Sequence, residues 1–167
     1  MAEQESVIAN ILTGLRSQLD GMTIPFGNTD KTATCAMQRT IRDINGDYPF
    51  IEIALDEVTK SNESVKSGLY SARVVVYVFT ALNDDDLAND PVSYQARNTA
   101  SYVLKQVMSD TTIGGKALNM DHLSFGQEVV EYTDAYGESA DSAEFLSWIV
   151  LDIQFFMNRT DPFILIG

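Results

Sequence analysis

The densest group of charged side chains that could perform chemistry is the run Asp84, Asp85 and Asp86, with Asp90 four residues further on. Closely spaced carboxylates can bind a hard cation such as Mg²⁺ or Ca²⁺ through their oxygen atoms. The run lacks the spacing of an EF-hand loop, however. It also precedes a predicted helix, whose N-terminus favours acidic residues. We therefore interpret it as a solvated charge run rather than a metal site, and we predict no cofactor.

Other candidates for catalysis are isolated residues. Cys35 and His122 are the only cysteine and the only histidine, and together they could form a nucleophile and its base. Neither flanking sequence supports that role, so we expect both to be structural. The stretch Gly114-Gly115-Lys116 lacks the other positions of a phosphate-binding loop, and we interpret its glycines as a turn. The sequence therefore predicts a protein that is not an enzyme.

The elements that would hold these residues are read from the spacing of apolar residues. Apolar side chains at helical spacing predict a helix from Val7 to Leu19, ended by Asp20-Gly21. A second helix begins at Asp90-Pro91, where the aspartate suits the N-cap and the proline suits the first turn. A Thr111–Gly115 turn closes that helix.

Strands are predicted where β-branched and aromatic residues gather. Apolar residues on both faces of 70–80 indicate a central strand of a covered sheet. The polar stretch 56–69 predicts a long hairpin loop, and 133–142 predicts another polar tip. The remaining expected pieces are a short extended segment near 24–26 and strands at 33–41, 50–55, 121–132 and 145–158.

These elements predict one domain over residues 1–167 with an α+β fold. We expect a mainly antiparallel sheet of four to five strands, with the N-terminal helix and the mid-chain helix packed on one face.

Charge and composition narrow the range of partners. Asp and Glu total 24 against 11 Lys and Arg, a net charge of −13, which disfavours binding duplex DNA through its phosphates. The acidity can serve solubility alone, repel DNA that passes close by, or meet a basic partner. A single cysteine excludes an internal disulfide and fits a reducing compartment. No signal peptide and no apolar segment of bilayer length is visible, so we expect a soluble protein made in a cytoplasm, without a membrane partner.

The C-terminal residues 159–167 form a possible arm. Four large apolar side chains stand together near the terminus: Phe163, Ile164, Leu165 and Ile166. Such a segment can fold back as an edge strand of its own sheet, or it can bury itself in a neighbouring subunit, since exposed apolar runs tend to mark interaction surfaces. We take these residues, together with Asp84, Asp85 and Asp86, as candidate contacts with other subunits or partners.

The order of these motifs resembles the tail terminator (tail completion) proteins of tailed bacteriophages. The resemblance is carried by the N-terminal helix, by Tyr48-Pro49-Phe50-Ile51 at a strand start, by the valine-rich strand, by the mid-chain helix and by Asp110-Thr-Thr-Ile-Gly-Gly115. It covers most of the chain, from about Val7 to Asn158. This chain departs from the family pattern in its longer polar loops and in the Phe163–Gly167 tail.

The resemblance implies a virion protein at the junction of head and tail, assembled in the host cytoplasm. Such a protein forms a ring of copies of itself, typically six, which caps the tail tube, ends tube polymerisation and joins the tail to the head connector. Its partners would be further copies of itself, the tail tube protein and the connector or neck protein. DNA would pass through the ring without specific binding, past acidic residues that keep it from adhering.

Two other functions are compatible with the sequence. A head–tail connector or neck protein is the nearest, because related folds serve both roles. An acidic mimic of DNA, which inhibits a nucleic-acid-binding partner, belongs to a different class. The mimic predicts a monomer or dimer that binds a basic protein, whereas the terminator predicts a ring of defined order.

Overall fold

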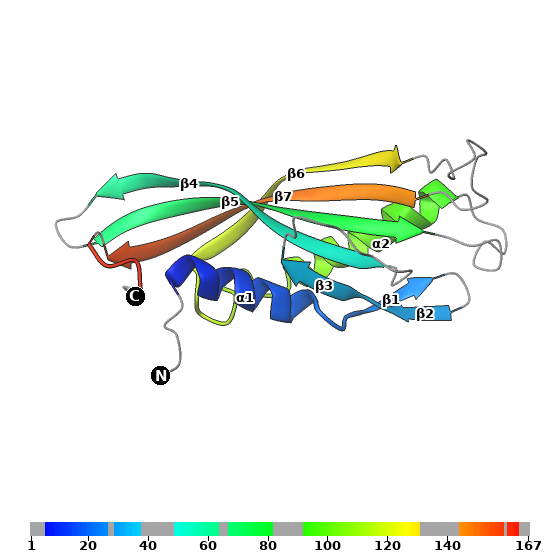
Figure 1. The fold of residues 1–167 in the computed structure, drawn as a ribbon, viewed down its shortest axis with the longest axis horizontal. Coiled ribbons are helices and arrows are strands. Elements are labelled where there is room, and N and C mark those ends of the chain that lie inside the picture. Colours follow the sequence, from blue (N-terminus) through cyan, green and yellow to red (C-terminus); the bar gives the residue numbers. More distant parts are fainter. Residues whose placement is uncertain are drawn as a thin grey trace, which may run out of the picture.

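The structure is a computed structural model that describes residues 6–26, 29–37, 49–63, 67–81, 92–130, 144–158 and 160–163. Within these ranges the chain forms two helices and seven strands (Figure 1). The elements follow the order α1 (Val7–Leu19), β1 (Thr23–Phe26), β2 (Thr29–Thr32), β3 (Thr34–Met37), β4 (Phe50–Glu63), β5 (Ser67–Ala81), α2 (Val92–Val107), β6 (Asn119–Val130) and β7 (Glu144–Asn158).

The strands build a sheet of five, in the order β3-β4-β5-β7-β6, and a separate antiparallel pair, β1-β2. The α+β class is confirmed, but the sheet, expected to be mainly antiparallel, is mixed: β3 runs parallel to β4, while the other neighbouring strands are antiparallel. The apolar pattern of a short strand indicates that it pairs, not in which direction. A parallel pair needs a connection of roughly a dozen residues or more. The sequence between Met37 and Phe50 is long enough to allow one.

The predicted hairpin loop over residues 56–69 is also wrong. β4 continues to Glu63 and β5 begins at Ser67, and the two strands pair from Phe50 and Phe79 out to Glu63 and Gly68. The side chains of this distal part of β4 are exposed, and most of them are polar. The segment therefore lacks the apolar alternation by which a half-buried strand is recognised. Register shifts at Leu55/Glu57 and Lys60/Asn62 interrupt the β4–β5 ladder.

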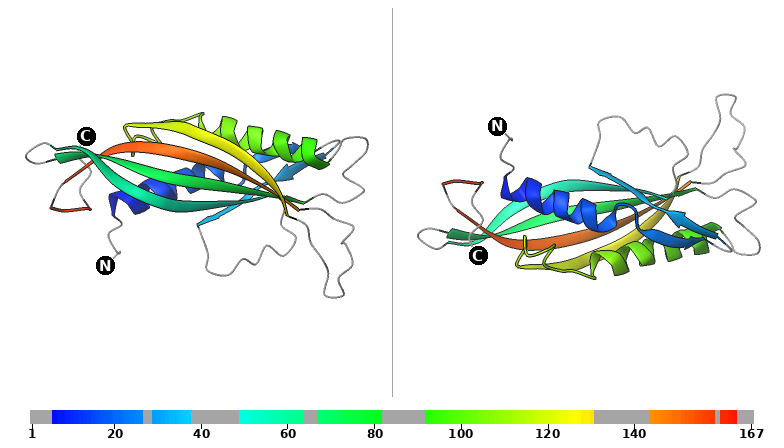
Figure 2. Two further views of the ribbon diagram at one scale, coloured as in Figure 1. Left: turned by 90° about the horizontal axis from the view of Figure 1, so that it is seen from above. Right: turned by 90° about the horizontal axis from the view of Figure 1, so that it is seen from below.

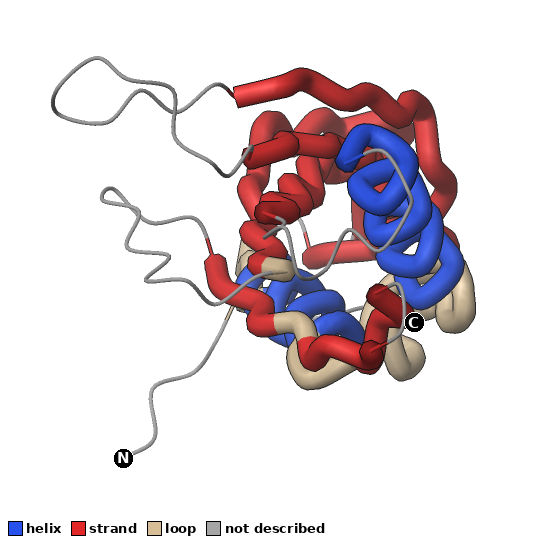
Figure 3. Tube along the Cα trace, turned by 90° about the vertical axis from the view of Figure 1, so that its right-hand side faces the viewer, coloured by secondary structure: helices blue, strands red, loops and turns tan. Residues whose placement is uncertain are grey.

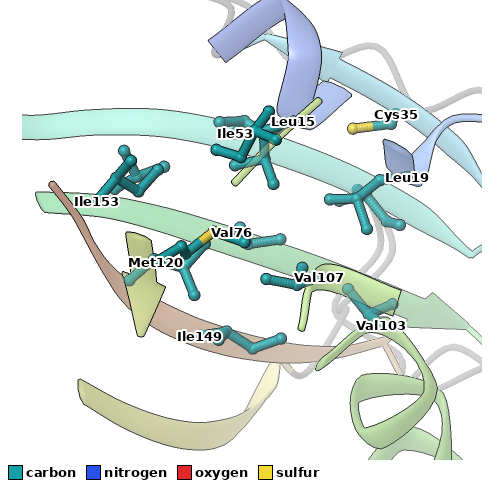
Figure 4. Packing of buried hydrophobic residues seen from close by; sticks show 14 of the residues in the cluster. Leu15, Leu19, Cys35, Ile53, Val76, Val103, Val107, Met120, Ile149 and Ile153 are labelled. Atoms are coloured by element: carbon teal, nitrogen blue, oxygen red, sulfur yellow. The ribbon is translucent and has the colours of Figure 1, made fainter. Parts of the chain in front are cut away.

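Both helices pack on one face of the sheet, as predicted. α1 lies across β3 and β4, while α2 packs on β5 and β7, toward the β6 side (Figure 2). Side chains from both helices meet the inward residues of the strands in one apolar cluster (Figure 4). Its members include Leu15, Leu19, Ile53, Val76, Val103, Val107, Ile149 and Ile153.

A smaller apolar cluster forms on the opposite face, where Phe50 and Phe79 lie with their ring centroids 6.3 Å apart and Ala36 packs beside them. Partly buried Tyr77 and Leu146 extend this cluster. β5 is therefore apolar on both faces and lies in the middle of the sheet, which confirms its prediction. Seen end-on, the strands form a curved layer rather than a flat one (Figure 3), as the twist of long strands requires.

Candidate functional site

The edge of the sheet at β3 is short and closed. The backbone N–H of Cys35 donates to Asp20 Oδ1 at 2.8 Å, and the Cys35 carbonyl accepts from Arg16 Nε at 3.1 Å. Beside them, Ala33 exchanges backbone hydrogen bonds with Gly21 and Met22. The outward-facing backbone groups of Cys35 are thus occupied by the end of α1 and the residue after it. A further strand therefore has no hydrogen-bonding groups to join at Cys35.

Cys35 and His122 do not form a catalytic pair. They lie on the two opposite edge strands, with β4, β5 and β7 between them, which is four strand spacings or roughly 19 Å measured along the sheet. Cys35 is buried, and desolvation raises its pKa to about 12, an effect that Asp20 reinforces and Arg16 opposes. The thiolate needed for nucleophilic attack is therefore scarce at neutral pH. His122 is exposed beside Asp121.

The opposite edge, β6, is long and open. Eleven of its twelve residues pair with β7 on one side, and no described strand lies on the other. Leu123 is 53% exposed and Phe125 is 41% exposed. Leu123 stands at a register shift between His122 and Ser124, where the strand bulges. Bulges are frequent at sheet edges, where they re-aim side chains.

A second open edge runs along the distal half of β4. β3 pairs only with Phe50–Ile53, so no described strand lies beside β4 beyond that point. The side chains of Leu55–Ser61 are all exposed, including Leu55 at 38% and Val58 at 39%. The two open edges belong to opposite sides of the sheet.

Sequence reasoning missed both open edges. Seven large hydrophobic side chains are exposed in the described residues, and four of them belong to these edges: Leu55, Val58, Leu123 and Phe125. The available signal was the composition of Asn119–Val130, which contains apolar residues but no lysine, arginine or proline. Lysine and proline are among the devices that protect natural edge strands.

The Gly114-Gly115 segment is a turn, as predicted. Asp110 organises it: one carboxylate oxygen accepts from the Thr112 N–H and hydroxyl, and the other accepts from the Gly114 N–H at 2.7 Å. These hydrogen bonds, with that of the Thr112 side chain first, lower the pKa of Asp110. Gly114 and Gly115 have φ of +65° and +80°, which glycine adopts without steric penalty.

Ile113 fixes this turn against α1. It is a buried β-branched residue with φ of +52°, a conformation that such residues rarely adopt. A Cβ atom built on Gly14 would lie 2.7 Å from Ile113 Cγ2, so only glycine leaves room for the isoleucine there. The turn that follows α2 is therefore docked on the N-terminal helix.

The predicted contact residues are described only in part. Phe163 is 45% exposed, and it follows Pro162, whose carbonyl accepts from the Val7 N–H at 2.9 Å. The start of the arm is thus attached to the first turn of α1, and its described residues 160–163 form a turn rather than an edge strand. Ile164, Leu165 and Ile166 lie outside the described residues, as do Asp84, Asp85 and Asp86. Their role as interface residues stays a prediction.

Within the part of the chain that the structure describes, no three His, Cys, Asp or Glu side chains gather as metal ligands. No described helix is both long and apolar enough to cross a membrane. No protein-family model matches the sequence, and no curated protein is significantly similar to it.

Proposed function

We propose that this protein is a phage tail terminator: a ring of identical subunits, of which six is the expected number, that caps the tail tube and joins it to the head connector. The observation that carries the proposal is the docked turn Asp110–Gly115. It contains the residues with the strongest resemblance to that family: Gly114 and Gly115 suit their positive φ, and Ile113, also at positive φ, is buried against α1. The turn packs on α1 through Ile113 and Gly14, and α1 is another of the elements that carry the resemblance.

The order of elements supports the same proposal. A helix, a strand that begins after Pro49, a valine-rich strand, a second helix, the glycine turn and two final strands follow one another as the resemblance implies. Exposed apolar side chains at two separate sheet edges suit a subunit with neighbours on both sides.

The net charge of −13 has a use in such a ring. Acidic side chains that face the channel repel the phosphates of passing DNA. The same charge opposes association of the subunits, and salt weakens that repulsion, since the Debye length is about 8 Å at 0.15 M ionic strength. We therefore expect ring formation to increase with salt concentration.

The test combines light scattering on a size-exclusion column with negative-stain imaging, at low and at physiological salt, with and without tail tube protein. We expect a closed ring of one size that binds tube ends and stops their growth. A monomer at high protein concentration in every condition, without rings even beside tube protein, would overturn the proposal. A monomer that instead binds a basic nucleic-acid-binding protein would favour the DNA mimic.

A further inference from the structure

We propose that subunits join edge to edge: the outer edge of β6 pairs with the distal edge of β4 (Leu55–Ser61) in a second copy, so that the sheet of one subunit continues into the next. This inference rests on the proposed ring, and it names the surfaces that would form it.

The β6 edge has the properties of a strand meant to pair. An unpaired strand presents a row of free backbone N–H and C=O groups, and proteins that must stay monomeric blunt such edges with lysine, proline or extreme shortness. β6 has twelve residues and contains no lysine or proline; it carries Asp121 and a bulge at Leu123, and beyond the bulge Ser124–Val130 pair with β7 without a further register shift. Its exposed Leu123 and Phe125 add an apolar surface that a partner strand can cover.

The β3 edge shows how this fold closes an edge that is not used. There, Asp20 and Arg16 satisfy both backbone groups of Cys35. On β6, one edge residue interacts within its own strand, where the His122 N–H donates to Asp121 Oδ1 at 2.8 Å. In the described residues, no helix or loop outside the strand supplies such a partner to β6.

The distal β4 edge makes a second copy the fitting occupant. Extension of a sheet by hydrogen bonds requires a partner that itself offers an unpaired strand. In the same chain, no described strand lies beside the distal edge of β4; this edge includes one lysine, Lys60, and its exposed Leu55 and Val58 can be set against Leu123 and Phe125. Because the two edges lie on opposite sides of the sheet, joining them is a head-to-tail contact, which closes into a ring when the rotation allows.

Disulfide trapping tests the contact directly. Chains with Leu55→Cys or Val58→Cys are mixed with chains carrying Leu123→Cys or Phe125→Cys, giving four pairings that sample the register. The native thiol does not interfere, because Cys35 is buried and its pKa is about 12. Under mild oxidation we expect at least one pairing to give a cross-linked dimer, and a chain carrying both cysteines of that pairing to give a ladder. The control replaces Tyr102, which is exposed on α2 rather than on either edge strand. If no pairing cross-links more than Tyr102→Cys with Leu123→Cys, the proposal is overturned.

A charge substitution gives an independent readout. Leu123→Lys protects the edge as natural proteins do, and we expect it to abolish rings while leaving circular dichroism and the melting temperature of the monomer close to wild type. Tyr102→Lys should leave the rings intact. Rings that tolerate Leu123→Lys but vanish when residues 164–167 are removed would identify the C-terminal arm as the contact and overturn edge pairing.

The same experiments separate this inference from the proposed function. Rings without any cross-link between the two edges would remove edge pairing and leave the terminator in place. Edge-to-edge cross-links that give only dimers or open filaments, which neither close nor bind tube ends, would retain the pairing and remove the terminator.

Discussion

The two edge strands of the sheet, β3 and β6, differ in how their outward-facing backbone groups are satisfied. β3 has four residues, of which two are buried, and both backbone groups of Cys35 are satisfied from the end of α1. β6 has twelve, with exposed apolar side chains and no described strand beside it. The difference shows that a few side chains are enough to satisfy backbone groups at an edge of this sheet. The open edge in the same sheet is the basis of the proposed edge-to-edge pairing.

The sharpest test of this comparison makes the same substitution, leucine to alanine, once near the β3 edge and once on β6. Leu15 is fully buried where α1 covers the β3 side, and Leu15→Ala should lower the free energy of unfolding by about 2–5 kcal/mol. Leu123→Ala removes a side chain that is half exposed, so it should change monomer stability by less than about 0.5 kcal/mol. Urea unfolding followed by circular dichroism measures both. Similar losses in a monomeric preparation would mean that Leu123 belongs to the core rather than to an open edge.

The closure of β3 depends on one carboxylate. Asp20→Ala leaves the buried N–H of Cys35 without its acceptor, and we expect a loss of about 1–3 kcal/mol. The matched change on β6 is Asp121→Ala, whose side chain is exposed, and its effect should stay within about 0.5 kcal/mol. Thermal melts of the two variants give the comparison. Equal shifts would show that the hydrogen bond to Cys35 does not secure the edge.

Trp148, the only tryptophan, reports on β6. It lies opposite Gly126 in the neighbouring strand, and a Cβ atom built on Gly126 would come within 2.3 Å of its indole ring. Gly126→Ala should therefore push the ring outward. We expect a loss of about 1–2 kcal/mol, in the lower part of the range for overpacking, because the ring is partly exposed and can move. A red shift of the tryptophan emission should accompany it. Ser124→Ala, on the same strand, is the control, and an unchanged spectrum in Gly126→Ala would contradict the contact.

Much of the fold could be predicted because its signals are local. Val7, Ile11, Leu15 and Leu19 recur at a four-residue spacing and are all buried on one face of α1. The valines and aromatic residues of β5 required a strand covered on both faces. Gly114 and Gly115 required a turn, and both adopt positive φ.

What could not be predicted depends on contacts between distant segments. The parallel direction of β3 is a matter of its pairing with β4, and the positive φ of Ile113 accompanies its packing on α1; no neighbouring residue indicates either. On α2, Gln95 and Thr99 are buried although they are polar. The reason is non-local in part: the Gln95 side chain donates to the Pro25 carbonyl at 3.0 Å, while Thr99 donates to the Gln95 carbonyl. Which strands lie at the edges likewise depends on the order of the strands in the sheet. The spacing of apolar residues along the sequence does not reveal that order.

The smallest expected effect concerns the turn that leads from α2 into β6. Hydrogen bonds from Thr112 and Gly114 stabilise the charged form of Asp110 and lower its pKa in the folded protein. A lowered pKa contributes stability above the ordinary value of an aspartate, about 3.9, and that contribution is lost as the pH falls through the folded value. Asp110→Asn should therefore lower the melting temperature slightly at pH 7, and the difference from wild type should shrink under acid conditions. Melting curves across that pH range measure it. A difference that stays constant, or grows as the pH falls, would mean that the charge of Asp110 is not what holds the turn. The conformation of the turn that precedes β6 would then depend on Ile113 and the two glycines alone.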